Sequence, residues 1–281
     1  MTVTSMGLKP FTKWTGGKRQ LLGELRKQMP EKINNYYEPF IGGGALFFDL
    51  MPENATINDY NEELVFAYKA IRDDLDNLIN ELEIHASKNS KEYYYHIRSA
   101  DRDGRYEKMT DTQKAARLLY MLRVNFNGLY RVNSKGEFNT PYGRYKNPKI
   151  VDETLMREIS EFLNTSNIRI MNGDFEKAVA DVQKGDFVYF DPPYAPISAT
   201  SSFTAYTSDG FNLEEQIRLR DTFVKLDKRG AYVMLSNSSV PLIHELYQDY
   251  ANTTTIVGAT RMINSKANNR GKVDEVIVKN Y

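Results

Sequence analysis

The segment best suited to chemistry is Asp191-Pro192-Pro193-Tyr194, which directly follows the apolar stretch Phe187–Phe190. Such a stretch predicts a buried strand, and α/β folds bind ligands at the carboxyl ends of their strands. Prolines supply no N–H donors and an ionised carboxylate only accepts, so the segment offers oxygen acceptors to a group with two N–H donors, such as an exocyclic amine. Tyr194 adds a flat ring on which a heterocycle can stack. The alternative is a turn that only ends the strand.

A second candidate is the segment Glu38-Pro39-Phe40-Ile41-Gly42-Gly43-Gly44, which follows a short aromatic strand. Glycines let a ligand approach the backbone closely, although glycines alone indicate no more than a turn. Asp59-Tyr60-Asn61 stands at the end of the next predicted strand, where an acid commonly binds ribose hydroxyls. Together the two segments favour a cofactor that contains adenosine. Lys13-Trp14-Thr15-Gly16-Gly17-Lys18 is not a phosphate loop, because Thr12 stands where that motif requires glycine.

The elements that must position these residues form two groups of predicted strands on either side of a helical stretch. The strands are Asn35–Phe40 and Ala55–Asn58 before it, and Asn167–Met171, Phe187–Phe190, Ala231–Leu235 and Val273–Val278 after it. The predicted helices that alternate with them are Ala45–Leu50, Leu213–Leu226 and Leu242–Tyr247. This alternation is typical of a parallel sheet with crossovers. We therefore expect one α/β sheet built from both ends of the chain.

The middle of the chain has a different period. From about residue 62 to 122, apolar side chains such as Leu64, Tyr68 and Ile71 recur at helical spacing, and Thr110 with Gln113 forms a capping box. This stretch predicts an inserted helical domain. It is followed by Ser134-Lys135-Gly136, a turn sequence that predicts a β-hairpin between residues 131–133 and 137–140.

The composition excludes several kinds of site. With no cysteine, the chain has no thiol nucleophile, disulfide or thiolate zinc site. Three scattered histidines argue against a histidine metal site or a Ser/His/Asp triad. Apolar stretches such as Leu118–Leu122 are far too short to span a bilayer, and no secretory signal is recognisable at the N-terminus. We expect no metal and no membrane partner.

The formal net charge is zero, with 37 basic and 37 acidic residues, which by itself argues against a nucleic-acid partner. The charges are segregated, however. Between Arg117 and Lys149 the basic residues outnumber acids by seven to one, whereas Asp73–Glu83 has an excess of acids. The basic stretch also contains Phe126, Tyr130, Phe138, Tyr142 and Tyr145. A run of charge is usually a solvated face, but interleaved cations and aromatic rings suit phosphates and bases.

Taken together, the motifs follow one another in an order that resembles the Dam-type DNA adenine methyltransferases over nearly the full length. They are Lys13–Lys18, Glu38–Gly44, Asn58–Asn61, Asn125–Arg131, Pro141–Tyr145 and Asp191–Tyr194. The resemblance is closest to the DpnII-like modification enzymes, which recognise GATC. It implies that S-adenosyl-L-methionine is the methyl donor and that the acceptor is the 6-amino group of an adenine flipped out of double-stranded DNA. A cytoplasmic location follows from such a substrate.

The resemblance also implies a fold: a Rossmann-like class I methyltransferase sheet, mostly parallel with an antiparallel last strand, and an inserted helical target-recognition domain that carries a β-hairpin. We expect residues 1–62 and 165–281 to form the catalytic domain that binds S-adenosyl-L-methionine. Residues 63–164 would form the domain that recognises DNA.

Three residues are implied to be catalytic. Asp191 and the carbonyl of Pro192 would hold the target amine, and Tyr194 would stack on the target ring. The lone pair of the amine is delocalised into the ring, so Asp191 is expected to orient the amine as an acceptor rather than to act as a strong base.

The resemblance assigns the cofactor to a larger set of residues. Lys18 would pair with the methionine carboxylate, Asp59 would bind the ribose, and Phe175 would stack on the cofactor base; for Phe175 the alternative is a buried ring in a strand-to-helix turn. The complete set is Trp14, Lys18, Phe40, Gly42, Gly44, Asp59, Asp174, Phe175 and Asp191.

DNA contacts are expected mainly from the basic stretch. Arg131 is the candidate for reading a guanine, since arginine on guanine is the commonest specific contact. Phe126 and Asn127 would fill the gap that the flipped adenine leaves. The complete set is Lys13, Arg123, Phe126, Asn127, Arg131, Asn133, Arg144, Tyr145, Arg261 and Arg270. The last two belong to a loop that is either a phosphate clamp or an ordinary solvated loop.

Other functions remain as alternatives. Methylation of a cytosine ring carbon is excluded because it requires a thiol. Enzymes that methylate the 4-amino group of cytosine usually carry Ser in place of Asp191, and glutamine- or RNA-modifying relatives usually carry Asn. The alternative from another class is a DNA-binding protein that has lost catalysis, although Asp191, Pro192, Tyr194 and Asp59 are all intact.

Overall fold

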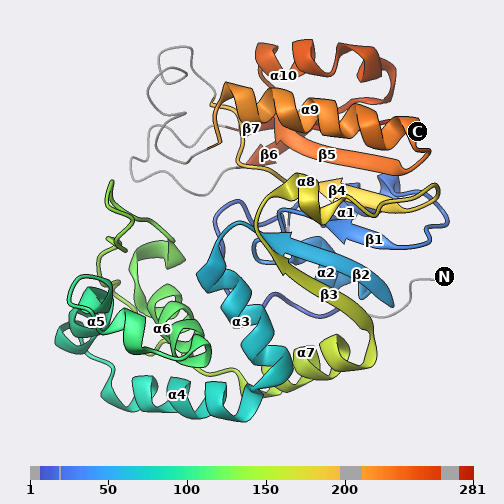
Figure 1. The fold of residues 1–281 in the computed structure, drawn as a ribbon. Helices are drawn as coiled ribbons and strands as arrows, with labels where there is room; N and C mark the ends of the chain where they lie inside the picture. The colour runs from blue at the N-terminus through green and yellow to red at the C-terminus, as the bar shows by residue number, and fades with distance from the viewer. Residues whose placement is uncertain (1–6, 19, 197–210, 261–271) are drawn as a thin grey trace.

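The structure is a computed structural model that describes residues 7–18, 20–196, 211–260 and 272–281. Seven strands in this part of the chain form one sheet in the order β3-β2-β1-β4-β5-β7-β6 (Figure 1). Five neighbouring strands, from β3 to β5, run parallel, and β7 is antiparallel to both β5 and β6. The strands are β1 Tyr36–Glu38, β2 Asn54–Asp59, β3 Asn167–Asn172, β4 Phe187–Phe190, β5 Tyr232–Ser238, β6 Thr255–Thr260 and β7 Lys272–Lys279.

Side chains of the central strands alternate between two apolar layers, as the period of a β-strand requires. In β4, Phe187 and Tyr189 belong to one core cluster, whereas Val188 and Phe190 belong to the other. Both faces of the sheet are therefore covered at its centre, which is why β4 reads as a continuous apolar run rather than as an alternating one.

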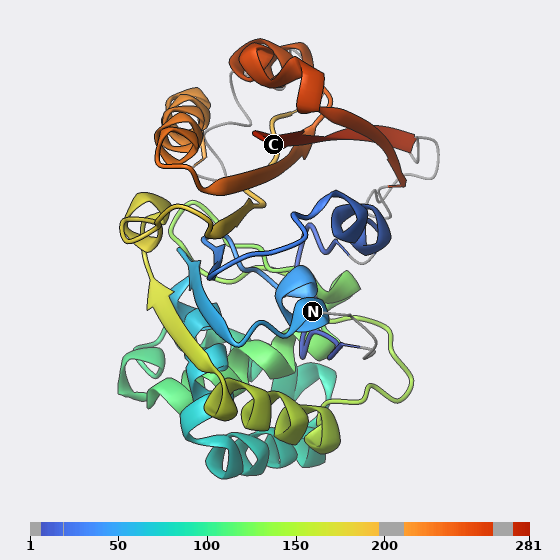
Figure 2. The same ribbon diagram turned by 90° about the vertical axis from the view of Figure 1, so that its right-hand side faces the viewer.

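Helices cover both faces, as Figures 1 and 2 show. One layer contains α8 Phe175–Ala178, α9 Leu213–Lys228 and α10 Pro241–Leu246, whose apolar residues share a cluster with Val188 and Phe190. The second apolar cluster includes residues of α1 Leu22–Gln28, α2 Ala45–Leu50, α3 Glu62–Asp73 and α7 Glu153–Thr165. It extends into α4 Leu75–Lys88, α5 Lys91–Arg98 and α6 Asp111–Val124, which form a group beyond α3, away from the sheet (Figure 1). No helix of the described residues is long and apolar enough to cross a membrane.

The helical stretch shares its core with the sheet. Leu64 of α3, Leu118 of α6 and Phe162 of α7 belong to the same apolar cluster as Ile57 of β2 and Ile168 of β3. The division of the chain at residues 62 and 165 thus remains a prediction about function, while the apolar packing continues across it.

The predicted fold class is confirmed: a mixed α/β sheet, mostly parallel, that ends in antiparallel strands and carries an inserted group of helices. The capping box of Thr110 and Gln113 is also present. Strand β6 was not predicted from the sequence. The turn around Ser134 brings Val132 opposite Phe138 through one isolated bridge, so the predicted hairpin is a short one.

Candidate active site

The candidate site lies beside β1, at the point in the sheet where successive strands are added on opposite sides. β1 pairs with β2 on one side and with β4 on the other, and all three run parallel. The carboxyl ends of β1 and β4 are therefore neighbours, and α/β sheets bind ligands in the crevice at such a point. The glycine turn that follows β1 and the Asp191–Tyr194 segment that follows β4 meet here.

A buried ion pair links this segment to the N-terminal region. Lys18 Nζ lies 3.0 Å from Asp191 Oδ1, and the two side chains are only 7% and 18% exposed. The same ammonium donates a hydrogen bond to the Gly16 carbonyl at 3.0 Å. The resemblance assigns Lys18 to the methionine carboxylate, whereas here its partner is the proposed catalytic carboxylate.

Tyr194 is held from two directions. The Lys18 ammonium lies 4.1 Å from the centre of its ring, a distance at which cation and π-face attract one another. Its hydroxyl donates a hydrogen bond to Glu275 Oε2 of β7 at 2.6 Å. Burial and the nearby carboxylates Asp191 and Glu275 raise the pKa of Tyr194 well above its usual value, so the phenol stays protonated and remains a donor.

A pair of buried amides fixes the backbone on both sides of Tyr194. Gln216 of α9 donates from Nε2 to the Pro193 carbonyl at 3.0 Å, and Asn237 Oδ1 of β5 accepts from the Ala195 N–H at 2.9 Å. The two amides also bond to each other, from Asn237 Nδ2 to Gln216 Oε1 at 3.2 Å. Both side chains are fully buried. Gln216 and Asn237 thus position the segment around Tyr194. The sequence analysis did not predict a role for either residue.

The electrostatics of the site favour a weakly acidic Asp191. Burial raises the pKa of its carboxyl from 3.8 to about 6, against the opposing effect of Lys18, and Glu275 adds to the increase. Lys18 thus compensates only part of the burial cost. Glu38, which accepts from Tyr36 at 2.6 Å, is a second buried carboxyl nearby, and burial raises its pKa well above the usual value.

The glycine turn after β1 is tied to Asp59 at the end of β2. Asp59 Oδ2 accepts from the Gly42 N–H and Oδ1 from the Asn61 N–H, both at 2.9 Å. Gly42 and Gly44 have positive φ angles of 48° and 70°. A Cβ on Gly42 would lie 2.9 Å from Trp14 Cδ1, so glycine permits Trp14 to lie against the turn.

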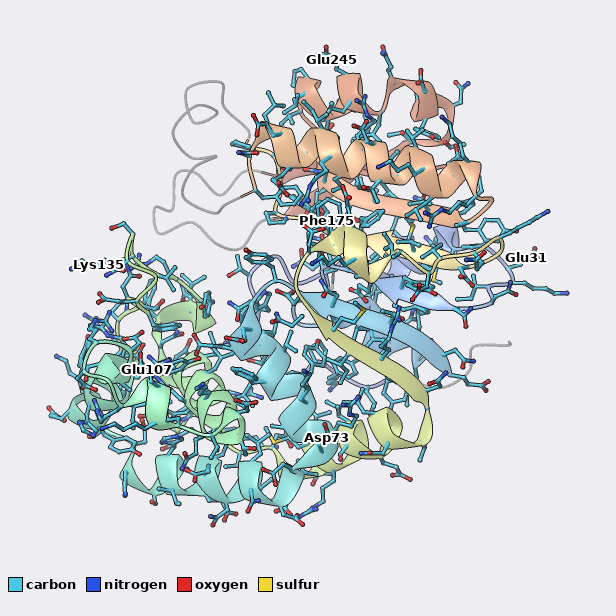
Figure 3. All side chains as sticks on the ribbon, in the orientation of Figure 1. Glu31, Asp73, Glu107, Lys135, Phe175 and Glu245 are labelled. Atoms are coloured by element: carbon cyan, nitrogen blue, oxygen red, sulfur yellow. The ribbon has the colours of Figure 1, made fainter. Side chains whose placement is uncertain are left out.

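Phe40 and Phe175 lie together beside this turn, with ring centres 5.3 Å apart. Phe175, labelled in Figure 3, begins α8 and is buried in the apolar cluster that contains Val188 and Phe190 of β4. The Arg218 guanidinium covers its ring at 4.5 Å and also donates to Asp174 Oδ2 at 2.6 Å. Asp174 in turn accepts from the Glu176 N–H and caps α8. The structure therefore brings the predicted cofactor residues together along the ends of β3, β2, β1 and β4.

The predicted DNA contacts divide into exposed and buried residues. Phe126, Asn127 and Tyr145 are exposed, Phe126 by 44%, and the Lys13 ammonium lies 5.5 Å from the centre of the Tyr145 ring. Asn127 has a positive φ angle of 59°, in a short 3-10 turn, Phe126–Gly128. These residues form one surface with the N-terminal segment.

Other candidates are engaged within the protein. Arg123 donates to the Phe11 carbonyl at 2.8 Å and is half-buried, which lowers its pKa. Asn133 binds Glu137 through its amide nitrogen and accepts two backbone N–H groups through its oxygen, so it stabilises the turn. Arg131 is exposed and donates to Asn139 Oδ1 at 2.7 Å, while Arg144 is exposed as well. Arg261 and Arg270 lie outside the described residues.

Some residues of the basic stretch Arg117–Lys149 are buried, so fewer of them are available to contact DNA than the sequence indicates. Arg117 is only 1% exposed and forms ion pairs with Glu63 and Asp101, so it does not belong to a DNA-facing surface. Phe138 is buried too, as an apolar anchor of the turn. Five basic residues of the stretch remain exposed. Lys135 lies on the turn that projects from the helices (Figure 3), and the others are Arg131, Arg144, Lys146 and Lys149. No group of residues suited to hold a metal ion occurs in the described part of the chain.

Comparisons with known proteins agree over nearly the whole chain. Residues 14–263 match a family model described as D12 class N6 adenine-specific DNA methyltransferase. The type II methyltransferase M1.LlaDCHI of Lactococcus lactis subsp. cremoris is 59% identical over 276 residues, which are 98% of this chain and 96% of the relative.

Two more distant relatives extend this similarity. The type II methyltransferase M.MjaIII of Methanocaldococcus jannaschii is 42% identical over 98% of this chain and 100% of the relative. The DNA adenine methylase of Escherichia coli K12 is 33% identical over 96% of this chain and 94% of the relative. The chain therefore belongs to the D12 class N6 adenine-specific DNA methyltransferases, enzymes whose methyl donor is S-adenosyl-L-methionine.

Proposed function

We propose that this enzyme methylates the 6-amino group of the adenine in GATC, in double-stranded DNA, after the adenine has been flipped out of the helix. The observation that carries the proposal is the arrangement at the end of β4, where a carboxylate and an aromatic ring share one buried ammonium. An acceptor beside a flat ring suits an amine attached to a heterocycle.

The residues of this chain would orient the amine and receive its proton. Asp191 and the Pro192 carbonyl accept the two N–H groups and direct the lone pair of the amine. In the transfer, the N6–carbon bond forms, the carbon–sulfur bond breaks with its electrons staying on sulfur, and one N6 proton leaves. A carboxylate with a pKa of about 6 is a better acceptor for that proton than an ordinary one.

S-adenosyl-L-methionine supplies, when bound, a methyl group on a positively charged sulfur. The residues at the ends of β1 and β2 fit its adenosine part. The two Asp59 oxygens accept the Gly42 and Asn61 N–H groups, and a carboxylate has further lone pairs that can accept from a ribose hydroxyl. Trp14 and the glycine turn would line the methionine side, and Phe40 with Phe175 the base side. Asp174 and Arg218 would complete that end.

The DNA would approach the surface of Lys13, Phe126, Asn127 and Tyr145. Phe126 is an exposed apolar side chain that could replace the flipped base in the stack. Arg131 would read a guanine, and Arg144 would contact phosphate.

The target sequence GATC is supported by the resemblance of the sequence motifs. A role as the modification enzyme of a restriction system is supported by the similarity to type II methyltransferases. Such a role belongs in the cytoplasm of a bacterial cell.

The test uses labelled S-adenosyl-L-methionine and short duplexes that differ at a single base pair of GATC. We expect label on the GATC duplex alone, and protection of that duplex from endonucleases that are blocked by adenine methylation. Equal labelling of all duplexes, or of one with another sequence, would identify an adenine methyltransferase with a different target.

A further inference from the structure

Glu275 is a buried carboxylate, and removing a charged group from water costs free energy. It lies on β7 and is only 7% exposed. Its side chain points to the same face of the sheet as Ile277, toward the site, whereas Asp274 is exposed and points to the opposite face. A buried carboxylate is retained only with compensating partners. The partner that the structure provides is the Tyr194 hydroxyl, at 2.6 Å.

This contact completes a chain of four side chains from distant parts of the sequence. Asp191 pairs with Lys18, the Lys18 ammonium lies on the ring of Tyr194, and Tyr194 donates to Glu275. One ammonium thus contacts both the Asp191 carboxylate and the ring whose hydroxyl binds Glu275. Because Lys18 covers one face of the Tyr194 ring, a base that stacks on this tyrosine has to use the opposite face.

We propose that Glu275 is a positioning residue for methyl transfer: it anchors the Tyr194 hydroxyl, sets the angle of the ring toward the target adenine, and counteracts Lys18 at Asp191. The inference rests on the proposed roles of Tyr194 and Asp191. It adds a residue of the last strand to a site otherwise built from the ends of β1, β2, β3 and β4 and from the N-terminal segment.

The charges around Asp191 support the second part of this role. Lys18 lowers the pKa of Asp191, and Glu275 raises it. The other titratable groups that face this region are Tyr194, Tyr189, which bonds to Ser236, and the buried Glu38–Tyr36 pair. Removing the charge of Glu275 leaves these neighbours in place, so the change should appear at Asp191.

The experiment compares E275Q and E275A, with D274N as the matched control on the exposed face of the same strand. For each, kcat and KM are measured from about pH 5 to 8 on the duplex that the wild-type enzyme labels best. Affinity for S-adenosyl-L-methionine is measured by calorimetry and folding by thermal unfolding.

Glutamine still accepts from Tyr194, so E275Q should keep kcat within a few-fold of wild type near pH 8. It should also keep relatively more activity near pH 5, because the pKa of Asp191 falls. E275A loses the anchor and should lose about tenfold or more in kcat, with cofactor affinity within about threefold. D274N should match the wild type at every pH.

The proposal is overturned if E275Q has the pH profile of the wild type, or if a folded E275A retains kcat within about twofold. Should E275A fail to fold, the pH profile of E275Q still decides. If instead the wild-type enzyme labels no duplex, the proposed function itself fails, which is a separate result.

Discussion

The ends of the central strands and the surface of residues 126–145 are organised in opposite ways. At the strand ends, charged and polar side chains are buried, and the central ones are held by residues far away in the sequence, as Asp191 is by Lys18 and Tyr194 by Glu275. On the surface, Arg131 and Asn133 bond only to their own turn. Chemistry requires a fixed geometry before the substrate arrives, whereas a DNA-reading surface can adjust to its partner.

The largest expected effect is at Asp191. D191A should lower kcat about 10³-fold, because the acceptor for the amine is lost, while cofactor and DNA affinities stay within a few-fold. Single-turnover transfer of a labelled methyl group measures the rate. D186N, at the start of the same strand, is the control: it removes a buried carboxylate that binds Asn35 and should reduce stability, with kcat preserved. Undiminished turnover in D191A would exclude the proposed role.

Asn237 tests whether the backbone of the segment needs its amide clamp. N237A removes the acceptor of the Ala195 N–H and the donor to Gln216 Oε1, which should cost about 1–3 kcal/mol of unfolding free energy. We also expect kcat to fall about tenfold or more, since the Pro192 carbonyl and Tyr194 shift together.

The control for Asn237 is N280A, which breaks three comparable hydrogen bonds of Asn280 away from the site. It should lower stability by a similar amount with kcat unchanged. If both variants lose activity in proportion to stability, the clamp has no special role in catalysis.

The pH dependence follows from the raised pKa of Asp191. The carboxylate is the form that accepts the amine, and it is formed only as the pH rises through about 6. On the acid side, kcat/KM should therefore fall about tenfold per pH unit below this value and reach a plateau above it. Initial rates with the duplex well below its KM, which report kcat/KM, and a separate unfolding measurement at each pH provide the check. An acid limb near pH 4 would indicate an unperturbed carboxyl instead.

The smallest and most specific effect is expected at Arg131. R131A should relax the preference for one base by about 1–3 kcal/mol and leave the other positions unchanged. Competition between duplexes with single substitutions measures this difference. K135A, at the exposed tip of the same turn, should weaken all duplexes alike or not at all. A uniform loss in R131A would make this arginine a phosphate contact.

Sequence reasoning was strongest where local pattern and topology coincide. The short apolar strands with their terminal motifs led to the sheet, and the parallel sheet by itself places Asp59, the glycine turn and Asp191 at one edge. The capping box was predictable for the same reason, since Thr110 and Gln113 are only three residues apart. Such features depend on neighbours within a few residues, which a single sequence contains.

What sequence reasoning missed depends on contacts between distant segments. Gln216, Asn237 and Glu275 are ordinary polar residues in a helix and two strands, and no motif marks them. For Glu275 the available signal was its position beside Asp274 within the predicted strand Val273–Val278, because adjacent residues of a strand point to opposite faces and one of two neighbouring acids therefore faces the core. Arg117 was misjudged for a related reason: its charge is visible in the sequence, but its acidic partners are 16 and 54 residues away.

The position of β7 has a consequence for synthesis. This strand inserts between β5 and β6, so β6 has no strand partner until residues 272–279 have left the ribosome. A nascent chain without it exposes the edge of β5 that β7 covers in the complete sheet and leaves β6 unpaired, and such open edges favour association with other chains. It also lacks Glu275, so the proposed positioning of Tyr194 by this carboxylate is missing. Methylating activity should therefore appear late in translation, and a chain released before residue 272 should be both inactive and prone to aggregate.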